Sequence, residues 1–122
     1  MAYILVIDDD DVMRSAICQI LRIEGYTPIE ASNGEIGMEL FKKNEFKLVI
    51  TDIVMPEKEG LETIQNLKRI SGSIPIIAVS GGGKFNSDIY LDLARSFGAK
   101  FTFSKPFDRE TFIIAVKNCL GE

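Results

Sequence analysis

Five polar side chains each come at the end of a stretch that is predicted to be a strand: Asp8, Asp9, Asp52, Ser80 and Lys105. Three carboxylates gathered in one place would repel one another by roughly 4 kcal/mol per pair at 4 Å and an effective dielectric near 20. Such a cluster needs a cation, and a small set of oxygen ligands suits Mg²⁺. A carboxylate beside the metal could attack phosphorus and become an aspartyl phosphate. The hydroxyl of Ser80 and the ammonium group of Lys105 would bind the other phosphoryl oxygens.

Short apolar runs of the sequence are typical of strands buried on both faces of a sheet. They cover residues 3–7, 48–50 and 74–79, whereas residues 26–31 are predicted as a weaker strand, where Pro28 suggests an edge position, and residues 101–104 as the fifth strand. Five helical patterns alternate with them, which predicts an α/β fold with a parallel sheet and helices on both faces. We adopt the flavodoxin-like strand order 2-1-3-4-5 for this doubly wound (βα)5 sheet. In that order the loops after the first, third, fourth and fifth strands share one rim, where the polar residues meet.

Turns and caps can be predicted at several places. Asn33-Gly34 favours a turn, and Pro56 with Gly60 marks a loop after the third strand. An Asp after the first strand and Asp108 near the end are suited to cap helices. Apolar stripes are expected to face the core, and the stripe of the fourth helix consists of Ile89, Leu93 and Phe97.

Length and composition exclude several classes of function. We expect residues 1–122 to form a single domain without an output domain in this chain. The net charge of −4 argues against a nucleic-acid surface. No apolar stretch could span a membrane and no signal peptide is recognisable, so we expect a cytoplasmic protein. The absence of histidine excludes imidazole chemistry on this chain, and Cys18 and Cys119 are expected to be reduced packing thiols.

Along its whole length the sequence resembles a response-regulator receiver domain of two-component signalling. The resemblance rests on short motifs in the right order, which are weak singly and specific together. They are Ile4-Leu5-Val6-Ile7-Asp8-Asp9, Asp52-Ile53-Val54-Met55-Pro56 with Gly60, Val79-Ser80-Gly81, Gly98-Ala99 and Lys105-Pro106-Phe107.

The resemblance implies a role for each motif residue. Asp52 would be the phosphoacceptor. Magnesium would be held by Asp9 directly, by Asp8 chiefly through water, by Asp52 and by the main-chain carbonyl of Val54. Ser80 would be the switch hydroxyl and Lys105 the phosphoryl contact, with a cis peptide bond between Lys105 and Pro106.

The resemblance also implies partners. A sensor histidine kinase or a histidine phosphotransfer protein would supply the phosphoryl group, and the switched domain would control a downstream protein. The chain would not be an enzyme beyond self-catalysed phosphorylation and dephosphorylation.

One position departs from the family pattern. Receivers often carry Tyr or Phe three residues before the lysine, where this chain has Thr102. Phe101 and Phe103 flank it, and alternation along a strand predicts that both rings point to the opposite face. We therefore expect activation to be expressed mainly from Ser80 to Ser87 and at the start of the fourth helix.

Three alternatives were weighed. Asp8, Asp10 and Val12 fit the motif of haloacid-dehalogenase-like Mg²⁺-dependent phosphatases, with Asp8 as nucleophile, but the paired acids expected after Lys105 are missing. A flavodoxin-like binding module would need a phosphate-cradling loop where this chain has four acids. A receiver that never takes phosphate would have no use for the intact set of acids, hydroxyl and lysine.

Overall fold

In the computed structural model of the chain, residues 3–53, 59–80, 87–105 and 107–122 are described. Strands and helices alternate along these residues. Their bounds are β1 (Tyr3–Ile7), α1 (Asp11–Ile23), β2 (Thr27–Ala31), α2 (Gly34–Lys43), β3 (Leu48–Asp52), α3 (Glu59–Ile70), β4 (Ile76–Ser80), α4 (Ser87–Phe97), β5 (Phe101–Ser104) and α5 (Arg109–Cys119).

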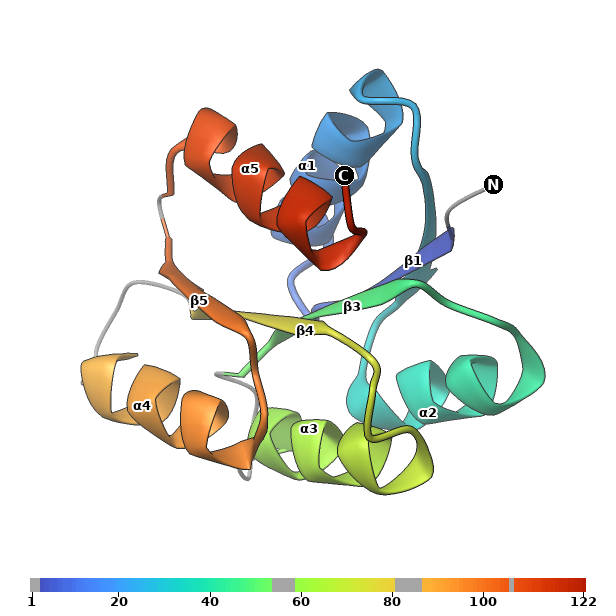
Figure 1. Cartoon of the computed structure of the whole chain (residues 1–122), viewed down its shortest axis with the longest axis vertical. Helices are drawn as coiled ribbons and strands as arrows, with labels where there is room; N and C mark the ends of the chain where they lie inside the picture. The colour runs from blue at the N-terminus through green and yellow to red at the C-terminus, as the bar shows by residue number, and fades with distance from the viewer. Residues whose placement is uncertain (1–2, 54–58, 81–86, 106) are drawn as a thin grey trace.

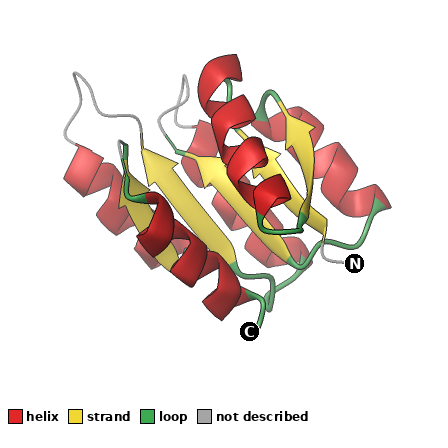
Figure 2. Ribbon diagram, turned by 90° about the horizontal axis from the view of Figure 1, so that it is seen from above, coloured by secondary structure: helices red, strands yellow, loops and turns green. Residues whose placement is uncertain are grey.

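The five strands form one parallel sheet in the order β2-β1-β3-β4-β5, which confirms the predicted fold. Helices α1 and α5 cover one face of the sheet, and α2, α3 and α4 cover the other (Figure 1). In the view from above, the strand arrows point toward the same edge of the sheet (Figure 2). The residues that end the strands are therefore brought to one rim.

Alternate residues of the three inner strands, β1, β3 and β4, enter two separate hydrophobic clusters. Val49 and Ile53 pack toward α2, α3 and α4, whereas Leu48 and Ile50 pack toward α1 and α5. Because both faces are covered, the inner strands are apolar at nearly every position. This explains why the strands stand out in the sequence as continuous apolar runs.

Side-chain caps fix where three helices begin. Asp10 accepts hydrogen bonds from the main-chain N–H groups of Val12 and Met13 at the start of α1. Asp108 accepts from the N–H of Thr111 and so caps α5, as predicted. The prediction of a turn at Asn33-Gly34 was wrong. Asn33 is the N-cap of α2 and Gly34 is its first residue, because an Asn side chain can satisfy the free N–H groups of a helix start.

The predicted apolar stripe of α4 was wrong in part. Ile89 and Leu93 are exposed, with 55% and 39% of their surface accessible to solvent. Ala94 is fully buried instead, and Leu91 and Phe97 pack against the core on the α2–α4 face. The stripe was assigned by hydrophobicity alone, but in this helix a small residue, Ala94, is fully buried.

No helix among the described residues combines the length and the apolar content needed to cross a lipid bilayer. Both cysteines are unpaired, Cys18 in the core and Cys119 partly buried near the end of α5.

Candidate functional site

Three carboxylates meet at the carboxyl edge of the sheet. Asp8 and Asp9 follow β1, and Asp52 is the last residue of β3. Asp8 is fully buried and Asp52 is 4% exposed, whereas Asp9 is open to solvent. Each acid offers a carboxylate oxygen, and these oxygens lie within 4.8 Å of one another. The parallel register of β1 and β3 produces this cluster from residues more than forty positions apart.

Asp8 is held in place by several hydrogen bonds. Its Oδ2 accepts a hydrogen bond from Lys105 Nζ at 2.9 Å, and its Oδ1 accepts from the N–H of Asp10, also at 2.9 Å. Its own main-chain N–H donates to the carbonyl of Ala31 on β2 at 3.1 Å. Every hydrogen bond fixes the carboxylate or its backbone relative to the sheet edge.

Lys105 joins the two buried acids. Its Nζ lies 2.9 Å from Asp8 Oδ2 and 3.9 Å from Asp52 Oδ2, and its side chain is only 9% exposed. The main-chain N–H of Lys105 donates to the carbonyl of Ser80 at 2.8 Å, which ties the end of β5 to the end of β4. The sequence analysis predicted Lys105 at this rim, and the structure shows that its Nζ lies closer to Asp8 than to Asp52.

Ser80 is the last residue of β4 and is fully buried. The strand beside it ends in Asp52, which pairs with Val79 in the register. On the other side, Ala78 is level with Thr102 of β5. Because Ala78 belongs to the cluster on the α2–α4 face, strand alternation turns both Ser80 and Thr102 toward that face.

The aromatic residues of β5 lie on the opposite face, as predicted. Phe101 and Phe103 pack with the cluster formed by α1 and α5. The ring of Phe103 lies 5.6 Å from the rings of both Phe107 and Phe112. Neither ring lies on the face of β5 that carries Thr102.

The electrostatics of the cluster favour a cation. Loss of hydration raises the pKa of Asp9, and the neighbouring charge of Asp8 raises it further; the N–H of Asp9 itself and Lys105 act in the opposite direction without cancelling the shift. Within the described part of the chain, three acids face one lysine, Lys105. The donors are all carboxylate oxygens and one acid is open to solvent, which fits Mg²⁺, a hard cation that retains waters.

Gly60 shapes the site from the next helix. It was predicted to lie in a loop, but it is in the first turn of α3, and it is buried. A Cβ at this position would lie 2.6 Å from the main-chain oxygen of Asp52 and would overlap the backbone of Ile53. The missing side chain lets α3 pack directly on the backbone that follows Asp52.

Several predictions lie wholly or partly outside the described residues: the metal-binding carbonyl of Val54, the change expected from Ser80 to Ser87 and the cis peptide bond before Pro106. One contributor was missed by the sequence analysis. Arg14 on α1 donates to the main-chain oxygen of Asp8 at 2.7 Å. Arg14 also donates to Asp11 and Glu30, and no sequence pattern distinguishes Arg14 from an ordinary surface arginine.

The structure does not favour the phosphatase alternative. In that hypothesis Asp10 belongs to the reactive motif together with Asp8. The Asp10 side chain instead accepts hydrogen bonds from two N–H groups at the start of α1, so its oxygen is engaged in capping.

Comparisons with known proteins agree with the geometry. The model of the response regulator receiver domain family matches residues 4–117. The chemotaxis protein CheY of Bacillus subtilis is 33% identical over 119 residues, which covers 97% of this chain and 97% of the relative. A solved response regulator receiver domain protein from Clostridium thermocellum has a TM-score of 0.88 and 31% identity, with 99% of this chain and 95% of that chain covered.

Other relatives differ in length. The autoinducer 1 sensor kinase/phosphatase LuxN of Vibrio campbellii is 36% identical over 78 residues, which is 64% of this chain but only 9% of that protein. The sporulation initiation phosphotransferase F of Bacillus subtilis is 29% identical, with 96% of this chain and 92% of the relative covered. The match to the family model and the relatives of similar length lead to one conclusion: the chain belongs to the response regulator receiver domain family, whose members act in phosphorelay signalling.

Proposed function

We propose that Asp52 accepts the phosphoryl group in this domain. The observation that carries the proposal is the position of Asp52 at the end of β3, buried, with its carboxylate beside those of Asp8 and Asp9 and 3.9 Å from Lys105 Nζ. A carboxylate so placed is held near both positive charge and any metal at the site. The donor would be a phosphohistidine of a sensor kinase or of a histidine phosphotransfer protein, and the reaction would take place in the cytoplasm.

In the proposed reaction a carboxylate oxygen of Asp52 forms a bond to phosphorus. The bond from phosphorus to the donor imidazole breaks, and that nitrogen keeps the electron pair. Magnesium held by Asp8, Asp9, Asp52 and the carbonyl of Val54 would supply positive charge to the phosphoryl oxygens.

Two further residues of this chain would bind the transferred phosphoryl group. Lys105 exchanges part of its contact with Asp8 for a phosphoryl oxygen, and Ser80 donates its hydroxyl hydrogen to another. The movement of Ser80 would start the conformational change that a downstream protein detects. Residues 81–88 would carry most of this change because Thr102 provides no ring to follow the hydroxyl.

The proposal is tested with acetyl phosphate as a small phosphoryl donor. The wild-type protein should gain one phosphoryl group by intact mass when Mg²⁺ is present, and none when EDTA removes it. Asp52→Asn should gain none, because an amide oxygen is a poor nucleophile. If Asp52→Asn were labelled and Asp8→Asn were not, the nucleophile would be Asp8 and the proposal would fail.

A further inference from the structure

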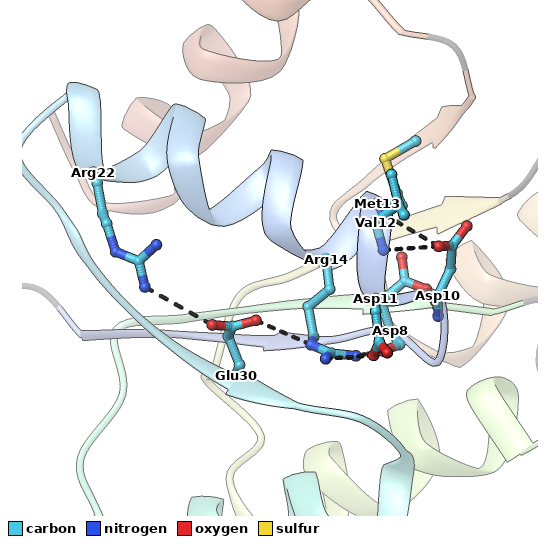
Figure 3. A network of polar contacts seen from close by, with 8 residues as sticks. All are labelled: Asp8, Asp10, Asp11, Val12, Met13, Arg14, Arg22 and Glu30. Atoms are coloured by element: carbon cyan, nitrogen blue, oxygen red, sulfur yellow. Dashed lines mark hydrogen bonds and ion pairs between the residues drawn. The ribbon is translucent and has the colours of Figure 1, made fainter.

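Arg14 lies behind the metal-binding acids rather than among them. Its guanidinium sits beneath the first turns of α1, between the end of β1 and the edge strand β2 (Figure 3). Its side chain is only 14% exposed. Three groups from different elements accept hydrogen bonds from it, which is more than an arginine on an open helix surface usually finds.

The contacts have a distinct geometry. Nη1 donates to the main-chain oxygen of Asp8 at 2.7 Å, Nη2 to Asp11 Oδ1 at 2.6 Å, and Nε to Glu30 Oε1 at 3.1 Å. The planar fork of a guanidinium can satisfy three acceptors in fixed directions, whereas an ammonium group on a flexible stem cannot. Arg14 therefore joins β1, α1 and β2 at a single point.

The acceptor on Asp8 matters for the next residue. The carbonyl of Asp8 belongs to the same rigid peptide unit as the nitrogen of Asp9. Fixing that oxygen fixes the plane from which the Asp9 side chain departs. Asp8 itself has further anchors in Lys105, Asp10 and Ala31, whereas Asp9 is exposed.

We infer that Arg14 is a positioning residue for the metal site: by holding the Asp8 carbonyl, it orients Asp9 toward Asp8 and Asp52 and so raises the affinity for Mg²⁺. The inference rests on the proposed function, because it concerns the same cation. The inference predicts a change in Mg²⁺ affinity opposite to the one expected from charge. By charge alone, a cation near three carboxylates disfavours Mg²⁺, so removal of Arg14 would tighten binding. By positioning, its removal weakens binding.

Two substitutions separate charge from position. Arg14→Lys keeps the positive charge but loses the planar fork, and Arg14→Gln loses both. Arg22→Ala is the matched control, because Arg22 lies on the same helix and approaches the same Glu30, at 3.9 Å, but is 58% exposed. In Figure 3 it lies at the far side of Glu30, away from Asp8.

The assay is calorimetric titration of each metal-free protein with Mg²⁺ at constant ionic strength, well below its melting temperature. We expect Arg14→Lys and Arg14→Gln to bind Mg²⁺ about tenfold more weakly, the size of effect usual for residues that orient metal ligands. Arg22→Ala should bind as the wild type does. Unchanged affinity in Arg14→Lys, or tighter binding in Arg14→Gln, would overturn the inference. If Arg14→Gln does not fold, Arg14→Lys decides alone.

A second measurement needs no metal. In the metal-free protein, Arg14→Lys should shift the amide resonance of Asp9 and speed its hydrogen exchange, while amides at the end of β4 stay unchanged. An unchanged Asp9 amide would also overturn the inference. If the wild-type protein itself failed to bind Mg²⁺, the proposed function would fail first, and the Asp9 amide would still report whether Arg14 holds the loop.

Discussion

The crowding of acids at the rim predicts that removing one charge stabilises the metal-free protein. Asp52→Asn is the informative change, because Asp52 is 4% exposed and its carboxylate lies within 4.8 Å of two others. At an effective dielectric near 20, each repulsion at that distance is roughly 3.5 kcal/mol. The attraction from Lys105 at 3.9 Å returns roughly 4 kcal/mol.

The two repulsions thus exceed the one attraction by roughly 3 kcal/mol, and the exposure of Asp9 screens part of this difference. We expect Asp52→Asn to raise the free energy of unfolding by about 2 kcal/mol in EDTA. The assay is urea denaturation of the wild type and the variant, with the slope compared to confirm the same transition. Asp92→Asn serves as the control, because it removes the same charge from an exposed position on α4.

Magnesium should reverse the order of stability of the wild type and Asp52→Asn. Saturating Mg²⁺ relieves the repulsion in the wild type, adding about 2.7 kcal/mol at a hundredfold excess over the dissociation constant, and adds less to a variant with weaker binding. Equal stability of Asp52→Asn and Asp92→Asn without metal would refute the reasoning, since it would mean that the three acids do not strain one another.

Three further outcomes follow from the site and the core. Lys105→Ala should keep Mg²⁺ binding, because it removes a cation rather than a ligand, yet lose most amide shift changes on adding beryllofluoride; a large loss of metal affinity would contradict its assignment. Thr102→Tyr should extend those shift changes from the segment after Ser80 onto β5 without altering Mg²⁺ affinity, and changes already larger on β5 in the wild type would disprove the account of the switch. Burial, and then the charge of Glu30, raises the pKa of Cys18 from 9.0 to about 11. The folded state therefore holds the proton that the unfolded chain releases, so stability should fall as pH rises from about 9 to 11, by up to about 1.4 kcal/mol per pH unit. Urea titrations across this range should show a shallower fall in Cys18→Ala.

Much of the fold was predictable because of the buried sheet. Residues 3–7 were predicted as a strand with the bounds the structure has, since a strand covered on both faces leaves a continuous apolar run. Residues 101–104 were also predicted with the bounds of β5, although two of the four are polar. Asp52 and Ser80 were predicted to follow their strands and are instead the last residues of β3 and β4. Strand ends are hard to locate when a polar residue completes the hydrogen-bonded ladder.

Helix faces and long-range contacts were less predictable. Ile89 and Leu93 looked like core residues but are exposed, and the buried face of α4 is formed by Ala94 with Leu91 and Phe97 packed against the core. The contact of Arg14 with Glu30 depends on β2 lying beside β1, which the sequence around Arg14 does not encode. The chemistry of the rim could be inferred from residue types, but not which cation pairs with which acid.

The most direct test of the account is to locate the phosphoryl group on the chain. The protein is phosphorylated with acetyl phosphate and Mg²⁺, then reduced with borohydride, which converts an aspartyl phosphate to homoserine. Peptide mass spectrometry should find homoserine at position 52, the end of β3. It should appear only in the sample that received acetyl phosphate and Mg²⁺ before the reduction. Homoserine at position 8 or 9, or no modified aspartate in the wild-type protein, would contradict the assignment of Asp52 as the phosphoacceptor.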